Sequence, residues 1–442
     1  MSFKSNYLYL ILPSFALCLI PIALLTGPFL PDFLLVLIAI TYLSKSISEK
    51  FHDFFKSKII IILSIFTVYI LIRSIFSIDP LLSLESSLFY FRYIFFSLAI
   101  YYVFSSNVKL VKYFLLITIT VILIVIFDSW LQFFTGSNIL GFKKIYVDPG
   151  YRVSSFFGNK FILGSYLQKM ILILLPLIYL QDELPSKKKY ILLNLFFIVL
   201  ILTVLITGER ASFILIVFSY LIFLLLSNGF KIYRILFLIF FFLSSSIFIY
   251  NSETIKPRLL NYTFDQITNF SKTNSKHTYS KIIDSDIIFF SPFHTGHYLT
   301  SWNMFKSNPI FGHGTKMFRK LCDDEEFKVI VIKKTNYVDE LDACSTHSHN
   351  IYMQLLSETG LFGFAFVFSL FLYLSFCLFK QLFLKIVKRK NFYSNFQITS
   401  ILSIFILLWP ISPHQNFFNN WVCVLYFISF GIFLLSIKKE KK

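Results

Sequence analysis

The sequence is short of charged residues. Only 14% of its 442 residues are Asp, Glu, Lys or Arg, whereas 56% are hydrophobic and 20% are aromatic. A water-soluble chain of this length cannot bury so much apolar surface, so the composition excludes a soluble globular protein. The apolar residues form runs of roughly 17 to 25, the length of an α-helix that crosses a bilayer. The sequence therefore predicts an all-α integral membrane protein surrounded by membrane lipids, rather than a β-barrel.

Several common motifs are also missing. The chain has no glycine-rich nucleotide loop, no Gly-x-Ser-x-Gly turn and no binding signature for a redox cofactor. We therefore expect no cofactor and no direct use of ATP. The first apolar run, from about Tyr7 to Leu25, lacks a small-residue cleavage site, so we interpret it as a retained membrane span.

Counting apolar runs predicts about twelve transmembrane helices. They lie near residues 7–26, 30–44, 58–77, 84–104, 113–133, 161–180, 190–207, 211–227, 235–250, 358–379, 396–412 and 420–437. A long polar segment separates the ninth helix from the tenth. We therefore divide the chain into residues 1–250 with nine helices, a large periplasmic loop with short helices over 251–354, and residues 355–442 with three helices.

Acidic residues are scarce, and the excess of Lys and Arg leaves a formal charge of +18. The lysines gather in short loops that fall on one side of the membrane in a twelve-helix count, as at Lys187–Lys189 and in the tail Lys438–Lys442. Short positive loops face the cytoplasm, so we expect both termini to be cytoplasmic and the 251–354 loop to be periplasmic. Attraction to anionic lipid explains this charge, and we expect no nucleic-acid partner.

The arginines show the opposite distribution. Six of the eight fall at outer ends of helices or in outer loops: Arg73, Arg92, Arg152, Arg210, Arg258 and Arg319. Because a guanidinium group binds two phosphate oxygens at once, this pattern indicates a ligand that carries phosphate at the outer leaflet.

Four of these arginines have a simpler explanation. Arg73 and Arg92 could form internal ion pairs with Asp79 or Asp128, or reach lipid headgroups. Arg210 could be balanced by the adjacent Glu209. The loop that carries Arg152 could simply be solvated.

Two histidines, His347 and His349, lie where the long polar segment ends and an apolar helix begins. A titratable group at a membrane surface is suited to proton transfer. Two positions apart on a helix, the pair would point to different faces, and the acidic run at 323–326 is typical of a solvated surface. We therefore predict no metal site.

Cys322 and Cys344 share the polar segment just before these histidines. In an oxidising periplasm they could form a disulfide, and closing this loop would stabilise the protein by about 3 kcal/mol. Two free thiols are the alternative.

The sequence resembles one known family. His349-Asn350, followed after nine residues by Gly360-Leu361-Phe362-Gly363, resembles the His-Asn-x9-Gly-x-x-Gly signature of the O-antigen ligase and polymerase superfamily. Thr207–Arg210 resembles its arginine turn, Trp302 with Asn308–Gly314 its Trp…Pro-x-x-Gly-x-Gly loop, and 152–164 its first periplasmic loop. Members often carry an arginine shortly before that Trp, where this chain has Gly296-His297.

The resemblance implies a metal-independent glycosyltransferase of the bacterial inner membrane with a periplasmic active site. Its donor would be a glycan linked to undecaprenyl diphosphate. Its acceptor would be lipid A core for a ligase, or another lipid-linked glycan for a polymerase. A flippase or transporter of lipid-linked oligosaccharides is the alternative, although such proteins typically have short loops and midplane cations.

The resemblance also implies roles for individual residues. His349 would be the general base on the acceptor hydroxyl, and Arg210, with Arg152 or Arg92, would hold the departing diphosphate. His347 is the rival base or a lining residue. Three residues are candidates to replace the missing arginine: Arg258, His297 and Arg319.

Overall fold

The computed structural model describes residues 3–49, 57–147, 150–182, 186–252, 255–261, 291–334 and 338–439. In these residues helices dominate, and the strands form two antiparallel hairpins. Ten of the described helical segments are long and apolar enough to cross a membrane. The prediction of an all-α membrane protein is confirmed.

The first part of the chain consists mainly of long apolar helices. Its elements are α1 (Phe3–Thr26), α2 (Phe29–Ser48), α3 (Lys58–Ile75), α4 (Pro80–Ser87), α5 (Arg92–Ser106), α6 (Val108–Thr135), β1 (Ile145–Val147), β2 (Gly150–Arg152), the short turn η2 (Ser155–Phe157), α7 (Leu163–Gln181), α8 (Lys187–Ile206), α9 (Arg210–Leu226) and α10 (Lys231–Asn251). The pair α4 and α5 together forms one apolar segment of spanning length.

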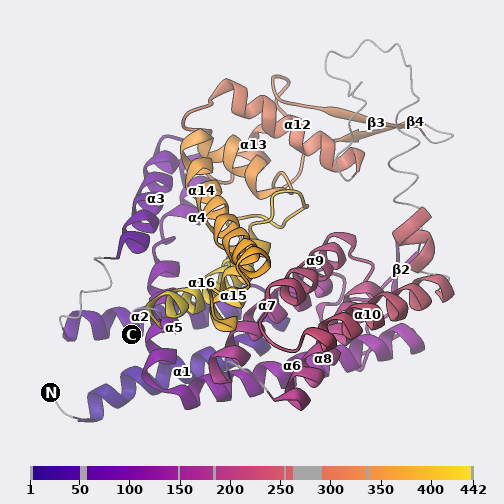
Figure 1. The fold of residues 1–442 in the computed structure, drawn as a ribbon. Helices are drawn as coiled ribbons and strands as arrows, with labels where there is room; N and C mark the ends of the chain where they lie inside the picture. The colour runs from indigo at the N-terminus through magenta and orange to yellow at the C-terminus, as the bar shows by residue number, and fades with distance from the viewer. Residues whose placement is uncertain are drawn as a thin grey trace.

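Short elements precede the last three helices. They are the turn η3 (Pro257–Asn261), α12 (Pro292–Ser307), α13 (Phe318–Leu321), β3 (Ile330–Lys334) and β4 (Val338–Asp342), followed by α14 (Ile351–Val387), α15 (Asn395–Leu407) and α16 (Asn420–Lys439). Figure 1 shows α12 and α13 at the top of the view, above α14.

Each predicted membrane span contains a helix, but two of the helices are short. α9 has 17 residues and α15 has 13. Because a span of the hydrocarbon layer takes about 20 residues, the predicted count of twelve is not confirmed.

Helix α7 forms the centre of the bundle. It packs against α6, α8, α9, α15 and α16, and its residues from Met170 to Leu175 are almost fully buried. A helix that is apolar on every side is stable only when protein or lipid covers it all round. α3 and α10, by contrast, expose many large apolar side chains, including Ile62, Ile239 and Phe242, as expected of helices that face lipid.

Helix α14 is broken at Gly360, where φ is 62° and ψ is −168°. The loop after α12 pairs with the broken backbone: Leu361 N donates to Pro309 O (2.8 Å), and Gly314 N donates to Glu358 O (2.7 Å). Backbone groups freed inside a membrane protein need such internal partners. At this break, the Asn308–Gly314 loop and the Gly360–Gly363 motif therefore contact each other directly.

This contact leaves no room for a side chain. A Cβ atom on Gly312 would lie 2.4 Å from the backbone N of Gly360, and one on Gly360 would lie 2.3 Å from the carbonyl O of Ile310. Both glycines also have positive φ, which L-residues rarely adopt.

We expect Gly312→Ala to lower the thermal midpoint of the detergent-purified protein well below that of Gly141→Ala. Both glycines have positive φ, so both variants carry backbone strain of about 1–3 kcal/mol. A Cβ on Gly141 meets nothing within 4 Å, whereas one on Gly312 overlaps the backbone of α14. Equal midpoints for the two variants would show that this contact does not hold the helix break.

Candidate active site

A cavity of about 730 Å³ lies where the N-terminal ends of α7 and α9 meet the segment before α14. Its lining includes Arg152, Arg210, Arg258, His347 and His349. These residues were singled out from the sequence although nearly 200 positions separate the first from the last. The fold brings them to one place because helices α7, α9 and α14 begin on the same side of the bundle.

Glu209 joins two of these helices. Its carboxylate accepts hydrogen bonds from the backbone N of Gly164 (2.8 Å) and Ser165 (3.0 Å) in the first turn of α7, and from Ser212 Oγ (3.0 Å) in α9. A carboxylate is favoured at a helix N-terminus because the free N–H groups and the helix dipole both attract it. Burial raises the pKa of Glu209, and the nearby Arg152 opposes this shift.

Arg152 and Arg258 both lie against the turn that precedes α9. Arg258 donates to Gly208 O (3.1 Å) and to Val147 O (2.8 Å), which ties η3 to the hairpin of β1 and β2. Gly208 has a φ of 70°, and a Cβ atom there would lie 2.9 Å from Arg258 Nε. The glycine of the Thr207–Arg210 turn thus allows the guanidinium group to come close.

Positive charge is concentrated in this half of the cavity. Burial, together with repulsion from Arg258 and Arg210, lowers the pKa of Arg152 to about 10, although Glu209 opposes the shift. Arg152 therefore remains protonated at neutral pH. A cluster of guanidinium groups with restricted solvent access favours a ligand with several negatively charged oxygens.

His349 lies in the other half of the cavity among three other histidines. Its ring centroid is 4.1 Å from that of His347, 5.1 Å from that of His297 and 5.7 Å from that of His294. Burial and the neighbouring His297 lower the pKa of His349 to about 4, so the ring is neutral at pH 7 and can accept a proton. Among the described residues no three His, Cys, Asp or Glu side chains are grouped as metal ligands.

Hydrogen bonding distinguishes His349 from its rival. His347 Nε2 donates to the carbonyl of His414 (3.3 Å), and its Nδ1 accepts from Thr346 Oγ1 (3.0 Å), so both ring nitrogens are engaged. The ring nitrogens of His349 have no hydrogen-bond partner within the described part of the chain. This difference supports His349 as the base.

Asn350 explains the second position of the His-Asn motif. Its side-chain oxygen accepts from the backbone N of Tyr352 (2.9 Å) and Met353 (3.2 Å) and so caps α14. Its Nδ2 donates to Pro410 O (2.8 Å) and Ser412 O (3.2 Å) in the α15–α16 connection. The cap therefore holds His349, whose φ is 55°, against that connection.

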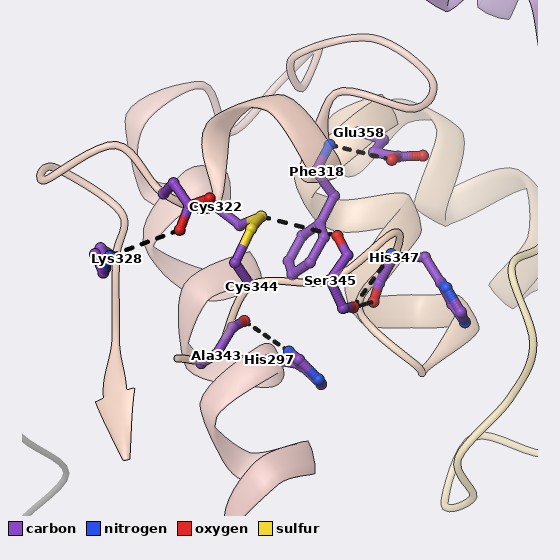
Figure 2. Close-up of a disulfide and its surroundings, with 10 residues drawn as sticks. His297, Phe318, Cys322, Lys328, Ala343, Cys344, Ser345, His347 and Glu358 are labelled. Atoms are coloured by element: carbon purple, nitrogen blue, oxygen red, sulfur yellow. Dashed lines mark hydrogen bonds and ion pairs between the residues drawn. A yellow bond between two sulfur atoms is a disulfide. The ribbon is translucent and has the colours of Figure 1, made fainter. Parts of the chain in front are cut away.

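A disulfide between Cys322 and Cys344 fixes the approach to His347, with the two Cα atoms 5.0 Å apart (Figure 2). Next to it, Ser345 Oγ donates to His347 O (2.6 Å). His297 Nδ1 donates to Ala343 O (2.6 Å), which ties α12 to the same segment. The cysteine pair thus attaches the histidine segment to the end of α13, and His297 attaches it to α12.

Three predicted residues do not line this cavity. Arg92 pairs with Asp32 (2.8 Å) and also donates to Tyr93 Oη (3.1 Å), so its internal ion pair is with neither of the two aspartates considered above. Arg319 lines a neighbouring cavity of about 520 Å³, which it shares with His347. His297 is fully buried beside His349.

Several lining residues were missed in the sequence, His294 and Gln415 among them. Lys169 lies on α7 and is only 7% exposed, and its Nζ donates to Ser165 Oγ. His414 lies between α15 and α16 and also lines the cavity. An ionisable residue inside a predicted span is itself a sign of function, so Lys169 could have been found on that ground.

Comparison with known proteins agrees with this geometry. Residues 195–368 match the family model described as O-antigen ligase. This segment is similar to the O-antigen ligase family. The matched segment contains both Arg210 and His349, and it confirms the resemblance to the O-antigen ligase and polymerase superfamily. A search of curated proteins found no match.

The similarity to the O-antigen ligase family supports glycan transfer of the ligase or polymerase type by a multi-pass membrane protein. The cavity has groups suited to such a reaction, since it combines a cationic half with a neutral imidazole. His294 and His347 are also neutral at pH 7, because burial lowers the pKa of each to about 3.

We expect acidification to destabilise this region. His294, His347, His349 and His414 all have a folded pKa of about 3 to 4, below the usual 6.5. Between pH 6.5 and 4 the unfolded chain binds more protons than the folded one, so stability falls as the pH falls. The thermal midpoint in detergent should drop by several degrees from pH 7 to pH 5. A flat profile would contradict the neutral state of these rings.

Proposed function

We propose that this protein transfers an undecaprenyl-diphosphate-linked glycan to an acceptor hydroxyl at the periplasmic face of the bacterial inner membrane. The observation that carries the proposal is one cavity that holds Arg152, Arg210 and Arg258 beside His349. Cationic groups on one side match a diphosphate, and an imidazole with unoccupied lone pair on the other side matches a hydroxyl to be deprotonated.

The proposed reaction needs no further energy source. The acceptor oxygen attacks the anomeric carbon of the donor sugar while the bond from that carbon to the diphosphate oxygen breaks. His349 takes the proton of the acceptor hydroxyl, and the arginines stabilise the charge that develops on undecaprenyl diphosphate. Because the diphosphate is a good leaving group, neither a metal ion nor ATP enters these steps.

The helix directions support a periplasmic site. α8 begins at Lys187 and ends at Ile206, next to the arginine turn. Its 20 residues span about 30 Å, so the lysines lie across the bilayer from the cavity. By the positive-inside rule these lysines face the cytoplasm. The start of α1 and the end of α16 lie on the same side of the molecule, which is consistent with two cytoplasmic termini (Figure 1).

The elements before α14 have the placement of a cap. α12 and α13 lie at the end of the bundle where α14 begins, and the disulfide and the glycine contact hold them there (Figure 1). We therefore retain residues 251–354 as a periplasmic cap over the site, between the membrane parts 1–250 and 355–442. Such a cap would position the glycan chains.

The direct test is transfer by the purified protein in detergent, with undecaprenyl-diphosphate-linked glycan, EDTA and no ATP. Lipid A core and a second undecaprenyl-diphosphate-linked repeat are offered as acceptors in parallel. Transfer to the first identifies a ligase, and chain growth on the second identifies a polymerase. If neither product forms in lipid nanodiscs either, the enzyme proposal is wrong, and movement of the lipid-linked glycan across vesicles would then support the flippase alternative.

His349→Ala should reduce the transfer rate by about 10²–10⁴-fold, the usual contribution of a general base. His347→Ala should cost much less, since both nitrogens of His347 already make hydrogen bonds to the protein. Rates are compared at equal amounts of folded protein, as judged by size-exclusion chromatography. Near-normal transfer by His349→Ala, or an equal loss in both variants, would remove His349 as the base.

A further inference from the structure

The connection between α15 and α16 presents two unusual atoms to the site. His414 Nε2 and Gln415 Oε1 are buried, and neither has a hydrogen-bond partner among the described residues. Leaving a buried polar atom unpaired is unfavourable by about 1–3 kcal/mol. Neighbouring residues that both leave a buried polar atom unpaired therefore indicate a ligand that pairs with them.

The hydrogen bonds of His414 define which ring nitrogen is an acceptor. Nδ1 lies 2.7 Å from the carbonyl O of Ser412, and a carbonyl can only accept, so Nδ1 carries the hydrogen. Nε2 then carries a lone pair. Burial and the nearby Lys169 lower the pKa of His414 to about 4, so this lone pair is available at neutral pH.

These two residues lie where two cavities meet. Both line the cavity of about 730 Å³ that contains His349. Gln415 also lines the adjacent cavity of about 520 Å³, as does His347. The smaller cavity is lined by Lys160, Arg319, Asn416 and Trp421 rather than by the three arginines around Glu209. It therefore shares His347 and Gln415 with the larger cavity but none of those three arginines.

The chemistry of the two residues selects the kind of ligand. Acceptor atoms repel the oxygens of a phosphate, which are acceptors themselves, but they bind hydroxyl donors. The side-chain amide of Asn416 in the smaller cavity is a further polar group that suits a sugar hydroxyl. The arginine cluster thus suits a diphosphate, whereas the α15–α16 connection suits a hydroxylated sugar ring.

We propose that the acceptor glycan binds where the smaller cavity meets the larger one, and that His414 Nε2 and Gln415 Oε1, which both line the larger cavity, accept hydrogen bonds from its sugar hydroxyls. This inference rests on the proposed glycan transfer. The backbone N of His414 donates to the carbonyl of His349 (2.7 Å), so the sugar-binding segment and the base are held in one unit. A sugar held there has its hydroxyls next to His349.

Three variants test this subsite. His414→Asn keeps an N–H for Ser412 but removes the acceptor atom, His414→Gln places an amide oxygen near the position of Nε2, and Gln415→Met removes the amide at similar volume. His414→Asn and Gln415→Met should each raise the KM for the acceptor about tenfold while the KM for the lipid-linked donor changes less than about twofold. His414→Gln should recover most of the loss, which a proton-transfer role would not allow.

A binding measurement separates this inference from the proposed function. The dissociation constant of lipid A core oligosaccharide, or of the lipid-linked repeat if that is the acceptor used, is measured on His349→Ala protein with and without His414→Asn. A tenfold weakening, roughly 1.4 kcal/mol, supports the subsite even if transfer fails. Unchanged acceptor binding when His414→Asn or Gln415→Met is added to this background, or a KM change confined to the donor, overturns it while leaving the proposed transfer intact.

Discussion

The constraint on which this structure depends is that a helix interrupted at a membrane must find partners for its freed backbone groups. Helix α14 meets it through the loop at Pro309–Gly314, which pairs with residues on both sides of Gly360. Glycine at positions 312 and 360 is required because the two backbones touch. At the start of the helix, before the break at Gly360, Asn350 caps the first turn and orients His349. The His-Asn pair, Gly360 and the Pro309–Gly314 loop are therefore held together at the start of α14.

The charges that line the cavity are unbalanced. Three arginines, a half-buried glutamate and a buried lysine line one half of the cavity, and the positive charge exceeds the negative. The Glu209 carboxylate caps the first turn of α7 and also lies in this charged cluster. Its negative charge therefore both holds α7 against α9 and offsets part of the positive charge. The excess of cations is stable because the arginines also donate to carbonyl groups, as Arg258 does at Gly208 and Val147. An anionic ligand would complete the balance.

Much of this could be predicted from residue patterns. The apolar runs identify the helices, because length and hydropathy are local properties, and the positions of His349, Arg210 and the glycines follow from the motif. The pairing of Arg92 could not be predicted, since Asp32 is 60 positions away and its proximity depends on how α2 packs against α5. The short lengths of α9 and α15 likewise depend on where the chain turns, which apolar runs do not define.

The sequence by itself determined that this is a helical membrane protein with cations and histidines at one face. Hydrophobicity and charge act locally, so their pattern can be seen without the fold. Tertiary structure decided that Arg152, Arg210, Arg258 and His349 share a cavity, that Glu209 caps α7, and that Lys169 and His414 join them. These contacts link residues far apart in the chain, and a distance across a bundle is set by packing rather than by spacing along the sequence.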